Sequence, residues 1–139
     1  MNVGSVFRTA DAFIIEKIYL CGITATPPNK EIMKTALSAN DSIDWEYIKD
    51  TKDIIAKLKG EKHHIIGVEQ TKNATFLNNF EPLNKKVVLV FGHEVFGVSQ
   101  EVIDLCDECI EIQQFGTKHS LNISVSVGIV LWEVYQKMN

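Results

Sequence analysis

The sequence lacks the marks of secreted and membrane-spanning proteins. It has three prolines and three cysteines in 139 residues, and it contains no apolar run close to the roughly 18 residues that a membrane span needs. No segment has the pattern of a signal peptide, and an odd number of cysteines argues against a disulfide framework. These absences lead us to expect a cytoplasmic protein with no membrane partner.

An excess of basic residues is missing as well. Lysine and arginine number 14 against 18 acidic residues, so the net charge is −4. A chain with this balance has no general phosphate-binding surface, and any contact with nucleic acid must be local. Its length and its 45% hydrophobic content suit a single domain, which we place at residues 1–139.

Short apolar runs alternate with helical patterns along the chain, which is typical of an α/β fold whose sheet is mostly parallel and flanked by helices. The predicted strands are residues 17–21, 64–68, 86–91 and 109–112, with a short edge strand around Trp45 and Tyr47. The predicted helices begin after residue 5, after Asn29, at Thr51 and near Asn122. Apolar residues surround most of the last helix, which predicts burial against a second subunit as well as the sheet.

Residues 92–99, GHEVFGVS, lie between a predicted strand and a predicted helix, where α/β proteins bind phosphate-bearing ligands. Val98 stands where a Walker loop needs its lysine, and the third glycine of a dinucleotide-binding loop is absent. The pair His93 and Glu94 starts like a zinc-protease helix, but no histidine follows at the required spacing. We therefore expect no metal site.

Two further pairs favour ordinary structural roles. Cys106 and Cys109 have the spacing of a metal or redox pair, but a single pair is a weak signal, and we expect two half-buried thiols. His63 and His64 stand at a strand start, where we expect surface charge rather than ligation.

Three islands carry the remaining signal: residues 2–13 (NVGSVFRTADAF), 90–99 (VFGHEVFGVS) and 116–128 (GTKHSLNISVSVG). In order, wording and spacing they closely resemble the motifs of the SpoU (TrmH-like) RNA 2′-O-ribose methyltransferases of the SPOUT superfamily, and the resemblance covers the chain from residue 2 to its end. It implies a deep C-terminal trefoil knot, a homodimer, and transfer of a methyl group from S-adenosylmethionine to a ribose 2′-hydroxyl of tRNA or rRNA. Composition and periodicity show none of these properties.

The resemblance also implies which residues bind the cofactor. Backbone groups of three loops hold S-adenosylmethionine in the family, and the matching positions here are Glu69, Gln70, Thr71, Gly92, Gly97, Ile112 and Leu121. A glycine at position 92 permits close backbone approach. Taken without the resemblance, Ile112 and Leu121 are better explained as core residues.

The residues that the family pattern makes catalytic are Arg8, Asn2, Glu94, Ser120 and Asn122. A guanidinium has a pKa above about 12, so we assign Arg8 first to clamping phosphate and stabilising the developing alkoxide, with base catalysis left open. Glu94 would neutralise Arg8, and the other three would supply hydrogen bonds. Each has a simpler alternative: helix capping for the three neutral residues, and a structural ion pair for Arg8 with Glu94.

Departures from the family pattern leave other functions open. Ile14 replaces a glycine that is usual in relatives, and we expect that the family's first strand is missing at the N-terminus. Because the chain is acidic, Arg8, Lys118 and His119 would have to form a local basic rim for RNA. The alternatives are a catalytically inactive knot-fold relative that binds RNA or scaffolds a dimer, and a phosphate-binding doubly wound module.

Overall fold

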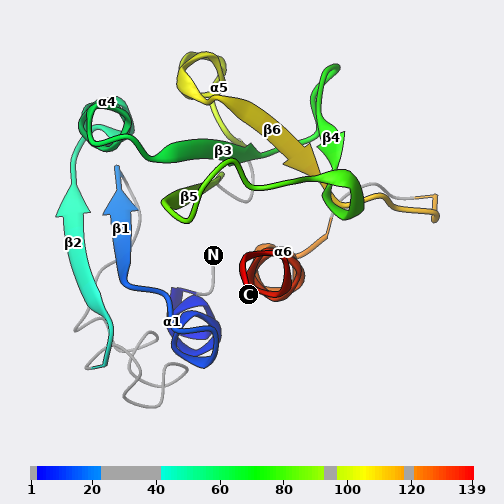
Figure 1. Cartoon of the computed structure of the whole chain (residues 1–139), viewed down its shortest axis with the longest axis horizontal. Coiled ribbons are helices and arrows are strands. Elements are labelled where there is room, and N and C mark those ends of the chain that lie inside the picture. The colour runs from blue at the N-terminus through cyan, green and yellow to red at the C-terminus, as the bar shows by residue number, and fades with distance from the viewer. Residues whose placement is uncertain (1–2, 23–41, 93–96, 118–120) are drawn as a thin grey trace.

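The computed structural model describes residues 3–22, 42–92, 97–117 and 121–139, and in these ranges every strand pairing is parallel (Figure 1). One sheet joins β1 (Lys17–Cys21) to β2 (Asp44–Ile48). The other has the order β4 (Thr75–Phe76), β6 (Glu108–Glu111), β3 (His64–Val68) and β5 (Val87–Phe91). The predicted parallel α/β architecture is confirmed.

The spacing predicts one sheet. This prediction is wrong for the described residues, which form two sheets. The reason is that the β1–β2 pair has an apolar core of its own, in which Leu20 and Ile43 pack with Val3, Phe7 and Ala10. The pair therefore buries its apolar face without a ladder to the larger sheet. The predicted edge strand at Trp45 and Tyr47 is β2.

The helices lie on both sides of the strands. They are α1 (Val3–Ala12), α4 (Thr51–Gly60), α5 (Gln100–Leu105) and α6 (Ile123–Met138), with a 3₁₀ turn, η1, at Leu77–Asn79. In Figure 1, α4 and α5 lie above the larger sheet, whereas α6 lies below it beside α1. The helix predicted after Asn29 lies outside the described residues. Among the helices that are described, none is long and apolar enough to cross a membrane.

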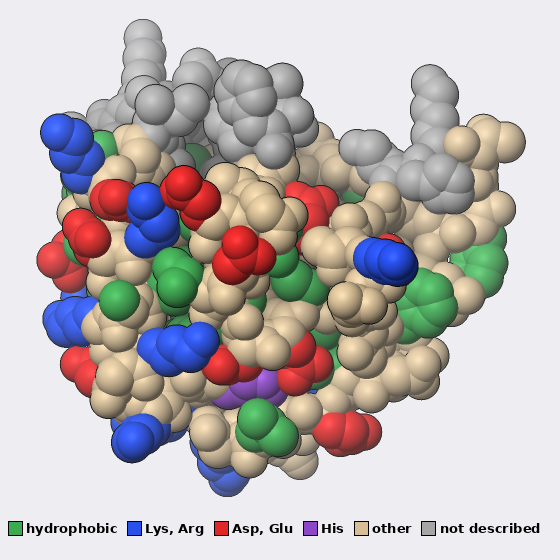
Figure 2. Space-filling model, turned by 90° about the horizontal axis from the view of Figure 1, so that it is seen from above, with side chains coloured by type: hydrophobic (Ala, Val, Ile, Leu, Met, Phe, Trp, Pro, Cys, Tyr) green, Lys and Arg blue, Asp and Glu red, His purple; other side chains and the backbone are tan. Residues whose placement is uncertain are grey.

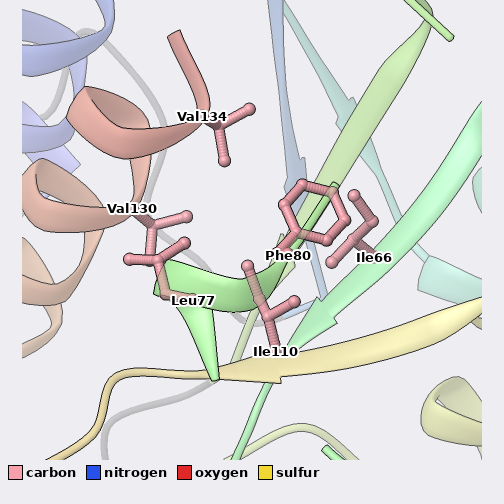
Figure 3. Packing of buried hydrophobic residues seen from close by; sticks show 6 residues of the cluster. All are labelled: Ile66, Leu77, Phe80, Ile110, Val130 and Val134. Atoms are coloured by element: carbon pink, nitrogen blue, oxygen red, sulfur yellow. The ribbon is translucent and has the colours of Figure 1, made fainter. Parts of the chain in front are cut away.

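The central strand β3 is buried on both of its faces. Ile65 is fully buried against α4 and α5, where it packs with Ile55 and Val102. Ile66, its neighbour, points to the opposite face and packs among residues of η1, β6 and α6, as Figure 3 shows. Successive side chains of a strand alternate between faces, so one apolar run serves two cores.

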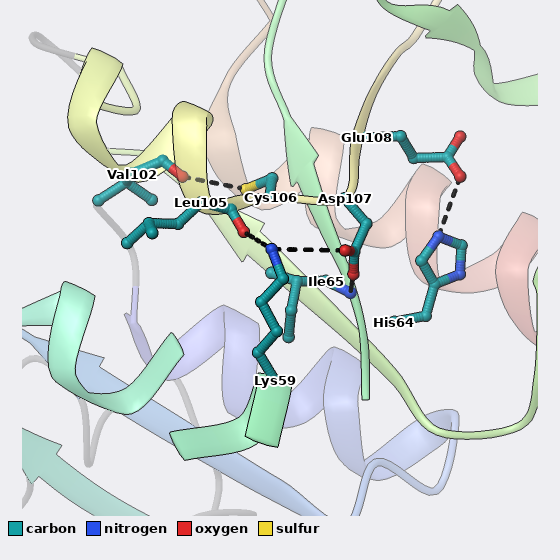
Figure 4. A network of polar contacts seen from close by, with 8 residues as sticks. All are labelled: Lys59, His64, Ile65, Val102, Leu105, Cys106, Asp107 and Glu108. Atoms are coloured by element: carbon teal, nitrogen blue, oxygen red, sulfur yellow. Dashed lines mark hydrogen bonds and ion pairs between the residues drawn. The ribbon is translucent and has the colours of Figure 1, made fainter. Parts of the chain in front are cut away.

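Polar contacts tie the beginning of β3 to its neighbours (Figure 4). The carboxylate of Asp107 accepts a hydrogen bond from the Ile65 backbone N–H at 2.7 Å and pairs with Lys59 at 3.5 Å. The expectation that His64 is a surface charge is wrong: only 3% of the residue is exposed. Its Nε2 lies 2.9 Å from the Glu108 carboxylate, its Nδ1 accepts from the Leu83 N–H at 3.4 Å, and its ring contacts Phe80, so the segment after η1 covers it.

Helix α6 is attached to the rest of the molecule at its C-terminal end. The ammonium of Lys137 donates to the carbonyl oxygens of Leu77 at 3.1 Å and Asn78 at 3.0 Å, and also to that of Phe80. These carbonyls belong to η1 and the residue that follows it, so one cation satisfies several acceptors at the end of a short turn.

Helix α1 ends in a Schellman motif that places a β-branched residue where glycine is normal. The Ile15 N–H donates to the Ala10 carbonyl and the Ile14 N–H donates to the Asp11 carbonyl, at 3.0 and 3.2 Å. Ile14 occupies the left-handed position of the motif, with a φ of 56°. The same residue is 76% exposed, so packing does not repay the backbone strain.

We predict that Ile14→Gly raises the free energy of unfolding by about 1 kcal/mol, because relief of the left-handed strain exceeds the entropy that glycine adds to the unfolded chain. Urea titration followed by circular dichroism measures the change. Lys62 has the equivalent place after α4, with a φ of 70°, and Lys62→Gly should give a smaller gain because lysine is not β-branched.

The control is Glu61→Gly, at a position whose φ is −89°. It has no positive φ to relieve and should lower stability. An equal gain from Glu61→Gly, or a loss from Ile14→Gly, would show that strain at residue 14 is absent.

Candidate functional site

The carboxyl ends of three parallel strands meet at one edge of the larger sheet. Val68 at the end of β3 is in register with Phe91 on β5 and with Ile110 on β6. The segments that follow these strands are residues 69–71, the loop that begins at Gly92, and the chain from Ile112 onward. Parallel sheets bind ligands outside this edge, so the structure brings together six of the seven predicted cofactor positions.

Gly92 and Gly97 lie in direct contact at this edge. A Cβ atom built on Gly92 would fall 2.3 Å from the Gly97 carbonyl carbon and 2.4 Å from the Val98 nitrogen. Only a residue without a side chain allows the two ends of the loop to approach so closely. Gly97 also has a φ of 65°, a left-handed conformation that favours glycine. Both glycines are therefore required by the backbone itself.

The Glu69 carboxylate connects the end of β3 to the returning end of this loop. Its Oε2 accepts a hydrogen bond from the Val98 N–H at 2.8 Å, and its Oε1 accepts one from the Gln70 N–H at 3.1 Å. A Cβ on Gly97 would lie 2.5 Å from the same Oε2. The Glu69 side chain thus faces the chain's own backbone, a contact that the sequence does not reveal.

The two cysteines lie behind this edge, on either side of Gly67. A Cβ on Gly67 would lie 3.1 Å from the Cys109 sulfur and 3.2 Å from the Cys106 sulfur. Burial, together with the nearby Cys109 and Asp107, raises the pKa of Cys106 to about 11. Burial also raises the pKa of Cys109, although a hydrogen bond with Thr71 opposes this effect. Half-buried, protonated thiols agree with the structural role predicted for Cys106, while Cys109 is more fully buried than expected.

The described residues contain no cluster of three or more histidine, cysteine or acidic side chains that could hold a metal ion. The prediction of no metal site concerns the whole chain, and it stays a prediction for the residues outside the described ranges.

Asn122 caps the last helix. Its side-chain oxygen accepts a hydrogen bond from the Ser124 N–H at 2.8 Å, which is the capping role weighed as its simpler alternative. Of the neighbouring apolar residues, Ile112 packs against the core beneath α6, but Leu121 is 37% exposed. The core explanation therefore suits Ile112 better than Leu121.

Sequence reasoning did not single out Ser124, which lies in the first turn of α6. Its hydroxyl oxygen is buried and has no hydrogen-bond partner among the residues that the structure describes. Buried hydroxyl groups are normally paired, so this oxygen is available to a group that approaches the start of α6. The only signal in the sequence is its spacing of two residues from Asn122 within the third island.

Arg8 is the only arginine in the sequence, and it lies exposed on α1. It forms no ion pair with any residue in the described ranges, which leave out Glu94, its predicted partner. Asn2 and Ser120, and with them Lys118 and His119 of the predicted basic rim, also lie outside the described residues. The structure therefore does not test whether the five predicted catalytic residues lie together.

Mixed charges cover the face above α4 and α5. Figure 2 shows lysine and acidic side chains interspersed there, in agreement with the net charge of −4. An open cleft of about 420 Å³ lies between the starts of these helices, where Lys52 pairs with Glu101 at 3.0 Å. None of the predicted site residues lines this cleft, so the glycine contact at the sheet edge is the better candidate for the functional site.

The whole pattern can be compared with known proteins. The chain matches the SpoU rRNA Methylase family over residues 1–132. It belongs to this family. The family membership predicted from the three islands is confirmed.

Relatives in the SpoU family are longer than this chain. The tRNA (guanosine(18)-2'-O)-methyltransferase of Escherichia coli (strain K12) is 28% identical over an alignment of 139 residues, which covers 98% of this chain but 58% of that protein. The chain thus spans little more than half of the curated relatives that it matches.

Solved structures agree with the fold. An AdoMet-bound rRNA methyltransferase from Sinorhizobium meliloti superposes with a TM-score of 0.91 at 25% identity, covering 99% of this chain and 52% of that one. The TrmH/SpoU tRNA modifying enzyme of A. aeolicus gives a TM-score of 0.86 at 25% identity, covering 98% of this chain and 68% of that one.

We predict slow modification of Cys106 by a thiol reagent in the native protein. When a thiol pKa rises from 9.0 to about 11, the thiolate fraction at pH 8 falls about a hundredfold, and the thiolate is the reactive form. Peptide mapping by mass spectrometry after brief labelling measures the rate, with the unfolded chain as the control. Because the folded pKa is the higher one, Cys106 should also make stability fall as the pH rises from about 9 to 11. Rapid native labelling would contradict the buried, protonated state.

Proposed function

We propose that this chain is the catalytic domain of an S-adenosylmethionine-dependent RNA methyltransferase that acts on a ribose 2′-hydroxyl of tRNA or rRNA. The observation that carries the proposal is the contact of Gly92 with Gly97 and Val98 at the carboxyl edge of a SpoU-family sheet. The relatives' names and the AdoMet-bound neighbour support the same activity.

The residues at the sheet edge fit such a cofactor. The glycine contact leaves backbone groups uncovered by side chains, and residues 69–71 and Ile112 add backbone groups from two further strand ends. We assign Ile112 and Leu121 to the adenine ring, because cofactor sites bind such rings against apolar side chains. When bound, the cofactor supplies a methyl group on a cationic sulfur, so the protein needs no metal to activate it.

The work left to the protein is the placement of the ribose hydroxyl and the stabilisation of its developing negative charge. Arg8 is suited to both tasks, because a guanidinium binds phosphate in a bidentate manner and keeps its charge. Glu94 would balance this charge beside the cationic sulfur. Asn2 and Ser120 would orient the substrate, and Asn122 would hold the start of α6 in place as its cap.

Substrate contacts must be local on an acidic chain. Lys118 and His119 lie in the third island and would complete a basic rim with Arg8. RNA as substrate, together with three cysteines that form no disulfide, suits a reducing cytoplasm. We also infer the C-terminal trefoil knot, which the similarity to the SpoU structures supports.

A homodimer is the final part of the proposal. Helix α6 carries an apolar stripe that the single chain leaves open: Val125, Ile129 and Trp132 are 49, 39 and 55% exposed. Their spacing of three and four residues puts them on one face of a helix. A second copy of this chain would supply an equal apolar stripe, and a symmetric contact of this kind covers both at once.

Isothermal calorimetry with S-adenosylmethionine and a methyl-transfer assay on RNA test the function. The chain should bind the cofactor, and Arg8→Ala should lower transfer about a hundredfold or more while cofactor affinity stays within about threefold. Lys57→Ala, on the exposed side of α4, is the control for lost positive charge and should retain transfer.

Two results would contradict the proposal. Absence of cofactor binding at millimolar concentration would leave only the RNA-binding or scaffolding relative. Loss of cofactor binding in Arg8→Ala would move Arg8 from the substrate side to folding or dimer assembly.

Sedimentation equilibrium tests the dimer. The double variant V125K/I129K puts two ammonium groups into the apolar stripe and should convert the dimer to a monomer, because each buried charge would lack a partner. Ala56→Lys, which adds an ammonium group at an exposed position of α4, should leave the dimer intact. A wild-type chain that sediments as a monomer would end this part of the proposal.

A further inference from the structure

We propose that the Glu69 side chain is a positioning residue that sets the geometry of the glycine loop, without itself contacting the cofactor. The inference rests on the function proposed above and assigns separate tasks to two parts of one residue. In the proposed function the backbone of residues 69–71 borders the cofactor site, whereas the carboxylate holds the returning end of the loop at Gly97 and Val98.

The contacts of the carboxylate occupy both of its oxygens. Oε2 accepts from the Val98 N–H at 2.8 Å and Oε1 accepts from the Gln70 N–H at 3.1 Å. The Glu69 N–H donates in turn to the Ile110 carbonyl at 3.1 Å, which fixes the residue against β6. Glu69 therefore links the ends of β3 and β6 to the loop that follows β5.

The position of Oε2 also explains Gly97. A side chain at residue 97 would meet this oxygen at 2.5 Å, well inside contact distance, so the carboxylate and the missing side chain fit each other. On the other side, Gly97 and Val98 touch Gly92 at the place where the loop begins. Glu69 contacts residues 97 and 98, and these in turn contact Gly92, so the two described ends of the loop are held together.

A carboxylate suits this task better than a neutral amide. Two backbone N–H groups point at it, and a carboxylate can accept from both, whereas a glutamine offers one acceptor oxygen and an NH₂ group that only donates. Hydrogen bonds to a charged acceptor are also the stronger kind. Glutamine should therefore keep part of the contact, and alanine should lose all of it.

Amide hydrogen exchange in the cofactor-free protein tests the contact directly. We expect the Val98 N–H to exchange at least about tenfold faster in Glu69→Ala than in the wild type, with an intermediate rate in Glu69→Gln. Glu101→Gln, at an exposed residue that pairs with Lys52, is the matched control and should leave Val98 protected. Unchanged exchange in Glu69→Ala would overturn the proposal, whatever the protein's activity. If Glu69→Ala fails to fold, Glu69→Gln decides by the same measure.

Ligand binding separates positioning from direct contact. S-adenosylmethionine has a cationic sulfur, and S-adenosylhomocysteine has a neutral one. If Glu69 acts through the loop, each variant should weaken the binding of S-adenosylmethionine and S-adenosylhomocysteine by one common factor. This factor should be larger for Glu69→Ala than for Glu69→Gln. Both variants should raise the KM for the cofactor more than they lower kcat.

A loss confined to S-adenosylmethionine, equal in the two variants, would overturn the proposal in favour of a charge contact with the cofactor. The wild type could bind neither ligand while Glu69→Ala still speeds exchange of the Val98 N–H. This result would count against the proposed function but would support the loop contact.

Discussion

The burial of β3 on both faces is the constraint on which the rest of this structure depends. Ile65 and Ile66 are fully buried on opposite sides, so helices must cover both faces of the larger sheet. Polar groups at the start of the strand are then removed from water, and Asp107 and Glu108 satisfy the Ile65 N–H and His64. With the strand enclosed, its carboxyl end is the part that remains open to a ligand.

That open end is shaped by backbone contacts more than by side chains. Gly92 and Gly97 are needed because two backbone segments touch there, and Glu69 holds the returning segment through the Val98 N–H. Such a site fits a cofactor that carries its own electrophile, since the protein then has to bind and orient rather than activate. The one arginine on α1 and the cap of α6 by Asn122 lie outside this contact and suit tasks on the substrate side.

Much of the fold followed from local patterns. The strands at residues 17–21 and 64–68 were predicted with their observed bounds, and the start of α6 within one residue, because apolar runs and caps are local signals. Other features depend on distant partners. His64 is buried because Phe80 and Leu83, from the segment after η1, cover its ring. Two sheets form where one was expected because β1 and β2 have a separate core.

The sequence by itself determined the family, the parallel α/β class and the glycines of the site, since these depend on residue types at short spacings. It also placed a β-branched residue at position 14. Only the tertiary structure decided that this position is left-handed, that Asn122 caps a helix, and that the Glu69 carboxylate reaches Val98 across 29 positions of sequence. Contacts of this kind depend on which strand ends become neighbours, and that follows from the packing of the whole sheet.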